Sequence, residues 1–168
     1  MTVNSSKSHV AQEQTRAVPL LIVSPACSLI LAVALFLTLR PLIPSHIARH
    51  VGPDGVGYSS TALIMAVIFA AAILPFLIGG ALALGFFRDG HWFPTQKAVV
   101  VCFVSLGYGV IGVALATILS TVGLDPAEVS GDSVAMGLLG FLLLFTAAVW
   151  TYAALLPRAG HEPLPRDY

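Results

Sequence analysis

Charged residues are scarce in this chain of 168 residues. Only 10% of the residues are Asp, Glu, Lys or Arg, whereas 57% are hydrophobic, and the mean hydropathy is +0.91. Soluble globular domains do not have this composition, so it indicates a membrane protein. The formal net charge is zero, and a protein without a basic excess is not expected to bind nucleic acid.

Cysteine is also rare, with only Cys27 and Cys102. Both lie within apolar runs, where a thiol behaves as a small hydrophobic side chain. The sequence therefore predicts no disulfide framework, and it gives no clear signal of the redox compartment.

Long uncharged runs dominate what is present. Each is long enough to cross a bilayer, because about 20 helical residues span the hydrocarbon core. Hydrocarbon offers no partner to backbone polar groups, so each run must close its own hydrogen bonds as a helix. The predicted fold is all-α, an integral membrane bundle of four transmembrane helices over 17–39, 61–87, 98–124 and 133–156.

The two ends of the chain differ from this bundle, which spans 17–156. Residues 1–16 are polar, and the tail at 157–168 is rich in proline. Neither end has apolar area to bury, so we expect the N-terminal stretch to be disordered and no further domain at either end.

Basic residues predict the orientation of the bundle. Arg40 and Arg49 are the only two in the loops expected on one side. The other side carries Lys7, Arg16, Arg88, Lys97, Arg158 and Arg166. Cytoplasmic loops carry the excess of Lys and Arg, so both termini are predicted to be cytoplasmic and the first loop extracytoplasmic.

The predicted spans contain no Asp, Glu, Lys, Arg or His, although transporters and pumps usually place such groups inside the membrane. Small residues recur at four-residue spacing, which predicts either a tight bundle or a homo-oligomer. The pairs are Ala81 with Gly85, Ser105 with Gly109, and Gly112 with Ala116. Trp92, Trp150 and Tyr152 are expected to anchor the chain at the membrane interface.

The densest polar cluster lies in the first loop, SHIARHVGPDGVGYSS at 45–60. Pro44 is expected to help end the first helix, and Ser45 to cap a short interfacial helix. On such a helix His46 and His50 share a face, because they are four residues apart.

A metal is one alternative for this loop, if a carboxylate joins His46 and His50. Two ligands without a third are a weak signature, so the histidines are interpreted as hydrogen-bonding groups of the loop, and no metal, cofactor or catalytic residue is assigned. Gly52, Asp54 and Gly55 belong to a turn cluster able to adopt positive φ. The cluster lacks the lysine of a phosphate-binding loop.

The string Ile43 to Gly55 resembles the signature of the bacterial membrane domain of unknown function 1648. The resemblance covers roughly 20–75. Its positions are filled by Pro44, His50, Val51, Gly52, Asp54 and Gly55, whereas His46 has no counterpart. The resemblance implies a link to the N-terminal part of SdpI-like immunity proteins, and a location in the bacterial inner (plasma) membrane.

Three functions remain open on this basis. The first is a non-enzymatic binding, immunity or signalling protein whose loop recognises a peptide, lipid or membrane-protein partner. The second is a small permease or transporter accessory subunit, with His50 as a proton-sensitive group. The third is an enzyme with a metal held by the histidines and the acidic residues Asp125, Glu128 and Asp132.

Overall fold

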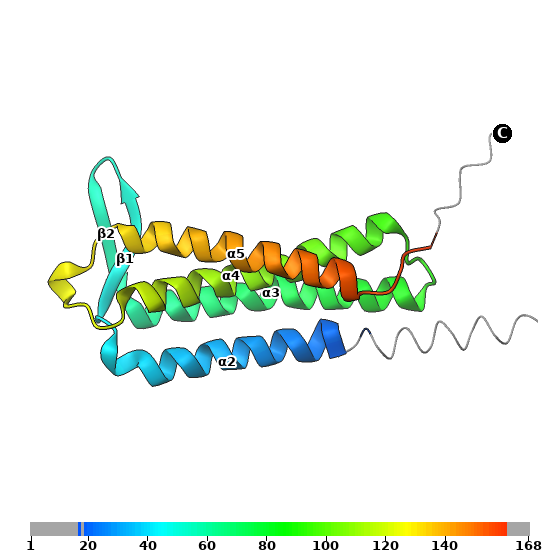
Figure 1. Ribbon diagram of the computed structural model, residues 1–168, viewed down its shortest axis with the longest axis horizontal. Helices are drawn as coiled ribbons and strands as arrows, with labels where there is room; N and C mark the ends of the chain where they lie inside the picture. Colours follow the sequence, from blue (N-terminus) through cyan, green and yellow to red (C-terminus); the bar gives the residue numbers. More distant parts are fainter. Residues whose placement is uncertain (1–16, 18, 161–168) are drawn as a thin grey trace, which may run out of the picture.

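The computed structural model describes residues 17 and 19–160. The chain forms an elongated bundle with a β-hairpin at one end (Figure 1). The 3-10 segments η2 (Arg40–Leu42) and η3 (Pro126–Glu128) also lie at the hairpin end. The helices are α2 (Ser24–Leu39), α3 (Thr61–Arg88), α4 (Pro94–Thr121) and α5 (Asp132–Leu155). The predicted N-terminal stretch at 1–16 and the last tail residues lie outside the described residues.

Four segments are long and apolar enough to cross a membrane, as the sequence predicted. Their bounds are Pro19–Leu42, Thr61–Arg88, Pro94–Thr121 and Asp132–Leu155. Helix α4, the third span, begins at Pro94 and not at the predicted 98. Proline fits its first turn, where the missing N–H costs nothing. The helix ends before the predicted 124 because Gly123 turns the chain with φ +78°.

The first span is not one regular helix. Residues Pro19–Val23 form a π-helical turn, η1, and α2 starts after it. Pro25 has no N–H to offer the carbonyl of Leu21. That carbonyl lies near Gly80 of α3, where an added Cβ would be 3.7 Å away. Pro25 therefore stands at the junction of two helical segments.

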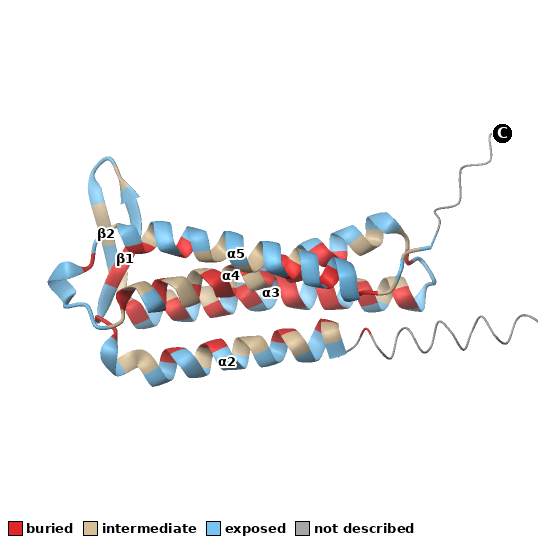
Figure 2. Cartoon of the chain, viewed as in Figure 1, coloured by how far each residue is buried: buried red, intermediate tan, exposed pale blue. Residues whose placement is uncertain are grey.

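Glycine brings α4 and α5 into close contact. A Cβ added at Gly140 would lie 2.3 Å from the carbonyl oxygen of Gly112 and 2.5 Å from the Cβ of Ala116. The predicted pair Gly112 and Ala116 thus serves packing within the chain. At Gly85, by contrast, an added Cβ would meet nothing within 4 Å. Buried residues concentrate along α3 and α4, and the outer surfaces of the helices are exposed (Figure 2).

The short interfacial helix predicted in the first loop is wrong. Residues His46–Gly52 form strand β1, which pairs antiparallel with β2 (Gly55–Ser60). The chain reverses at Pro53 and Asp54, and Gly55 follows with φ +108°. A Pro-Asp-Gly turn flanked by Val51 and Val56 favours a hairpin, and this signal outweighs the helical spacing of the two histidines.

Candidate functional site

The hairpin is fixed to the bundle at its base. Thr61, the first residue of α3, is fully buried, and its Oγ1 donates a 2.6 Å hydrogen bond to the carbonyl of Pro44. Its backbone N–H donates to the carbonyl of Ser45 at 2.9 Å. Ile47 is also fully buried. The hairpin therefore leaves the end of the bundle in a defined direction.

One face of the hairpin packs against the segment that leads into α5. The hydroxyl of Tyr58 donates a 3.0 Å hydrogen bond to the carbonyl of Val129. Val51 reaches Gly131 so closely that an added Cβ there would lie 2.6 Å from its Cγ2. Val56 is near the same glycine. These contacts attach the face that carries Val51, Val56 and Tyr58 to the last loop, and Val51 and Tyr58 keep part of their surface exposed.

A β-bulge separates the two histidines. His46 pairs with Ser60, and His50 pairs with Gly57, with the register shift at Arg49 between them. Directly paired residues share a face, and residues an odd number apart along a strand do not. Ser60 and Gly57 are three apart, so His46 and His50 lie on opposite faces. The expectation that they share a face is therefore wrong, because the bulge adds one residue to β1.

The ring of His50 lies on the hairpin backbone at Gly57. A Cβ added at Gly57 would lie 2.0 Å from Cε1 of His50, so only glycine leaves room for the ring. His50, Gly52, Asp54, Gly55 and Gly57 line a shallow hollow of about 300 Å³ around the turn. His50 and Asp54 are exposed. This open, glycine-rich face is turned away from the face that packs on Gly131.

The predicted loop residues therefore lie in three places. The structure brings His50, Gly52, Asp54 and Gly55 together around the hollow. Pro44 is buried at the base, where its carbonyl binds Thr61. His46 is exposed, and its Nδ1 lies 3.1 Å from the hydroxyl of the neighbouring Ser45.

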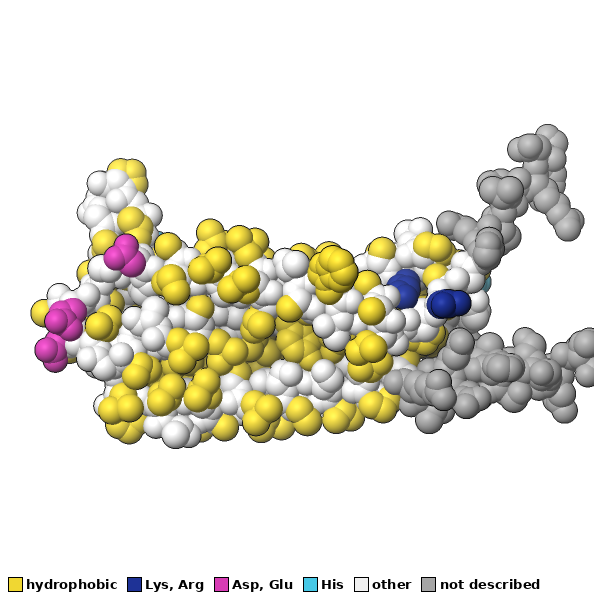
Figure 3. Space-filling model, in the orientation of Figure 1, with side chains coloured by type: hydrophobic (Ala, Val, Ile, Leu, Met, Phe, Trp, Pro, Cys, Tyr) yellow, Lys and Arg dark blue, Asp and Glu magenta, His cyan; other side chains and the backbone are white. Residues whose placement is uncertain are grey.

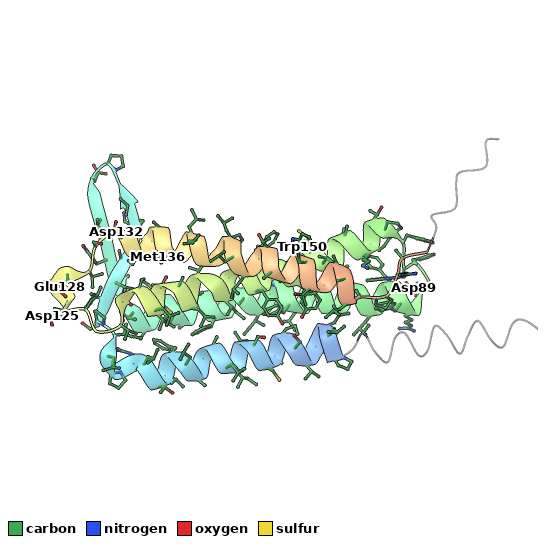
Figure 4. All side chains as sticks on the ribbon, viewed as in Figure 1. Asp89, Asp125, Glu128, Asp132, Met136 and Trp150 are labelled. Carbon is green, nitrogen blue, oxygen red and sulfur yellow. The ribbon has the colours of Figure 1, made fainter. Side chains whose placement is uncertain are left out.

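The acidic residues of the last loop do not join the histidines. Asp125 and Glu128 form a local capping box, and Asp132 accepts a 2.9 Å hydrogen bond from Ser130. Figure 4 shows Asp132 at the start of α5, and Asp125 and Glu128 in the loop that precedes it. Among residues 17 and 19–160, no group of three His, Cys, Asp or Glu side chains is placed to hold a metal ion. The geometry thus supplies no third ligand for the metal alternative.

A second polar cluster lies inside the bundle. The hydroxyl of Tyr108 lies 2.7 Å from that of Ser24 and 3.1 Å from that of Tyr152. Tyr152 also donates to the carbonyl of Leu20 in η1 at 2.9 Å. The cluster therefore joins η1, α2, α4 and α5.

Sequence reasoning missed the inward position of two aromatic residues. Tyr152 is only 3% exposed and Trp92 only 9% exposed, whereas Trp150 is 76% exposed. Trp92 stacks on Phe87, with ring centroids 4.3 Å apart. Only Trp150 lies on the outer surface, as expected for an interface anchor. The helical spacing is the signal that separates the two aromatic residues of α5, because positions two apart point in different directions.

These features define a class of protein, a multi-pass membrane protein with four helices apolar enough to cross a bilayer. Comparison with family models, curated proteins and solved structures found no match to the chain. The resemblance of the string from Ile43 to Gly55 to the domain of unknown function 1648 accordingly stays a prediction.

Proposed function

We propose that this chain is a non-enzymatic partner-binding protein of the bacterial inner membrane, with an immunity or signalling role. Its binding surface is the open hairpin face of His50, Gly52, Asp54, Gly55 and Gly57. One observation carries the proposal: the hairpin is attached through its base and its opposite face, and His50, Asp54 and Gly55 around the turn stay exposed.

The chemistry of this face favours an extended peptide segment as the partner. Among the described residues, the outward edges of β1 and β2 make no backbone hydrogen bond to another element. An exposed strand edge can accept a further strand, and glycine lets a second backbone approach closely. His50 and Asp54 add side-chain groups that distinguish one peptide from another. The segment belongs either to a secreted peptide or to a neighbouring membrane protein.

The inner hydroxyl cluster gives the transport alternative little support. Its hydroxyls bond to one another and to the carbonyl of Leu20, so they are already used within the protein. Ser28 and Tyr108 line a hollow of about 330 Å³, but its other walls are apolar. We therefore keep a permease or accessory subunit as the outcome that the experiment must separate.

The test compares the two histidines. A photoreactive amino acid placed at Asp54 captures partners in intact cells, while solute flux is followed in vesicles. His50→Ala is expected to reduce capture at least fivefold, and the matched variant His46→Ala, on the other face, to leave capture unchanged. A flux that depends on His50, with no captured partner, would show the transport function instead.

A further inference from the structure

The end of the bundle opposite the hairpin holds a segment that crosses the start of α4. The indole Nε1 of Trp92 donates a 3.1 Å hydrogen bond to the carbonyl of Pro157. The backbone N–H of Gly160 donates to the carbonyl of Trp92 at 2.8 Å. Together these bonds fix the chain after α5 and place Arg158 beside α4.

Lys97 completes this arrangement from the first turn of α4. Its Nζ donates a 3.1 Å hydrogen bond to the carbonyl of Leu156. An ammonium group has three protons to donate, so this bond leaves others for a ligand. The side chain is half-buried, and its position is set by the segment that carries Arg158.

Both cations line one end of an apolar groove of about 670 Å³ between α4 and α5. Its deeper walls include Val101 and Cys102 of α4 with Phe145 and Val149 of α5. No acidic residue lines it. From Ala153 to Phe145 the groove follows α5 for about 12 Å, given a rise of 1.5 Å per helical residue.

The charged side chains are also unevenly distributed along the direction of the groove. In Figure 3 the acidic side chains lie at the hairpin end and the basic side chains at the opposite end, with an apolar surface between them. The groove therefore starts at a basic end and runs toward the apolar middle. A ligand that fits both parts has an anionic head and an apolar tail.

We propose that this groove binds one anionic glycerophospholipid. Its phosphate lies beside Lys97 and Arg158, and one acyl chain lies between α4 and α5 against Val101 and Val149. Basic residues beside transmembrane helices attract anionic headgroups, and apolar walls match a lipid tail. The charge of the groove separates this lipid from a zwitterionic one of the same chain length.

Native mass spectrometry of the detergent-purified chain tests the proposal. The protein is mixed with equal amounts of phosphatidylglycerol and phosphatidylcholine that carry the same acyl chains. We expect the wild type to retain phosphatidylglycerol preferentially. Each of Lys97→Gln and Arg158→Gln should lower this preference about fivefold, since one cation near a lipid surface contributes about 1 kcal/mol.

Arg88→Gln is the matched control, because Arg88 is an exposed cation near the same end of the bundle and does not line the groove. It should leave the preference unchanged. Arg158→Gln keeps the test valid if loss of the Lys97 bond disturbs folding. An equal loss in all three variants, or no loss in Arg158→Gln, would overturn the proposal.

Two further measurements concern the tail and the source of the phosphate. Ala98→Trp fills the groove and leaves both cations in place, so it should reduce retention of phosphatidylglycerol. Glycerol 3-phosphate in excess should not displace the lipid. Displacement by this soluble anion, or full retention in Ala98→Trp, would contradict a lipid site.

Discussion

At the scale of single residues, Gly57 determines where the ring of His50 lies. In Gly57→Ala the new Cβ would occupy the position of the His50 ring, so the ring must swing into solvent. Because His50 is exposed, this movement should change the free energy of unfolding by less than about 0.5 kcal/mol. The imidazole signals of His50 in NMR spectra, assigned with His50→Ala, should shift in Gly57→Ala.

Gly52→Ala provides the control for that experiment. Gly52 is on the same face, and its added Cβ would be 3.9 Å from Cδ2 of His50, an ordinary contact. The His50 signals should therefore stay in place in Gly52→Ala. Equal shifts in both variants would contradict the position of the ring.

Single residues also show how much of the site the sequence alone predicts. The turn residues Asp54 and Gly55 were identified correctly, because Pro-Asp-Gly specifies a tight turn locally. The bulge at Arg49 was not predicted, since it depends on how the two strands pair. The face of His50 follows from that bulge, so the separation of the two histidines needed the structure.

At the scale of elements, α4 and α5 cross at Gly112 and Gly140. In Gly140→Ala the new methyl group would meet the backbone carbonyl of Gly112, and a backbone atom cannot rotate away. The helices must separate, which should cost about 1–3 kcal/mol of unfolding free energy. Unfolding in mixed detergent micelles, followed by circular dichroism, measures this loss.

Gly85→Ala is the matched control for Gly140→Ala. It also replaces a helical glycine of a small-residue pair, but its Cβ would meet nothing within 4 Å. Alanine favours a helix over glycine by about 0.5–1 kcal/mol, so this variant should be as stable as the wild type or more stable. Equal destabilisation of both variants would mean that helix propensity, and not the crossing, explains the result.

Elements were predictable where one physical rule dominates. Uncharged runs had to be helices in hydrocarbon, and all four were found, with bounds that moved by a few residues at Pro94 and Gly123. The small-residue spacing was ambiguous, because it predicts close approach but does not name the partner helix. In the structure Gly112 and Ala116 contact Gly140 of α5. At Gly85 an added Cβ would meet nothing within 4 Å.

At the scale of the whole molecule, the described charges are unequal at the two ends. The hairpin end carries Arg40 and Arg49 against four acidic residues, Asp54, Asp125, Glu128 and Asp132. The opposite end carries Arg88, Lys97 and Arg158 against Asp89 alone. Since basic residues favour the cytoplasmic side, this distribution predicts an extracytoplasmic hairpin. The proposed partner site and the proposed lipid site would then face different sides of the membrane.

Single cysteines at the two ends test this orientation. Asp54→Cys and His91→Cys, each in a Cys27→Ser, Cys102→Ser background, put one exposed thiol at either end. A membrane-impermeant maleimide added to intact spheroplasts should label the cysteine at 54 and not that at 91, and inside-out vesicles should give the reverse. The opposite pattern would place the hairpin in the cytoplasm, where a secreted peptide does not reach it. Labelling of both thiols from one side would contradict the single membrane crossing by α3 between residues 54 and 91.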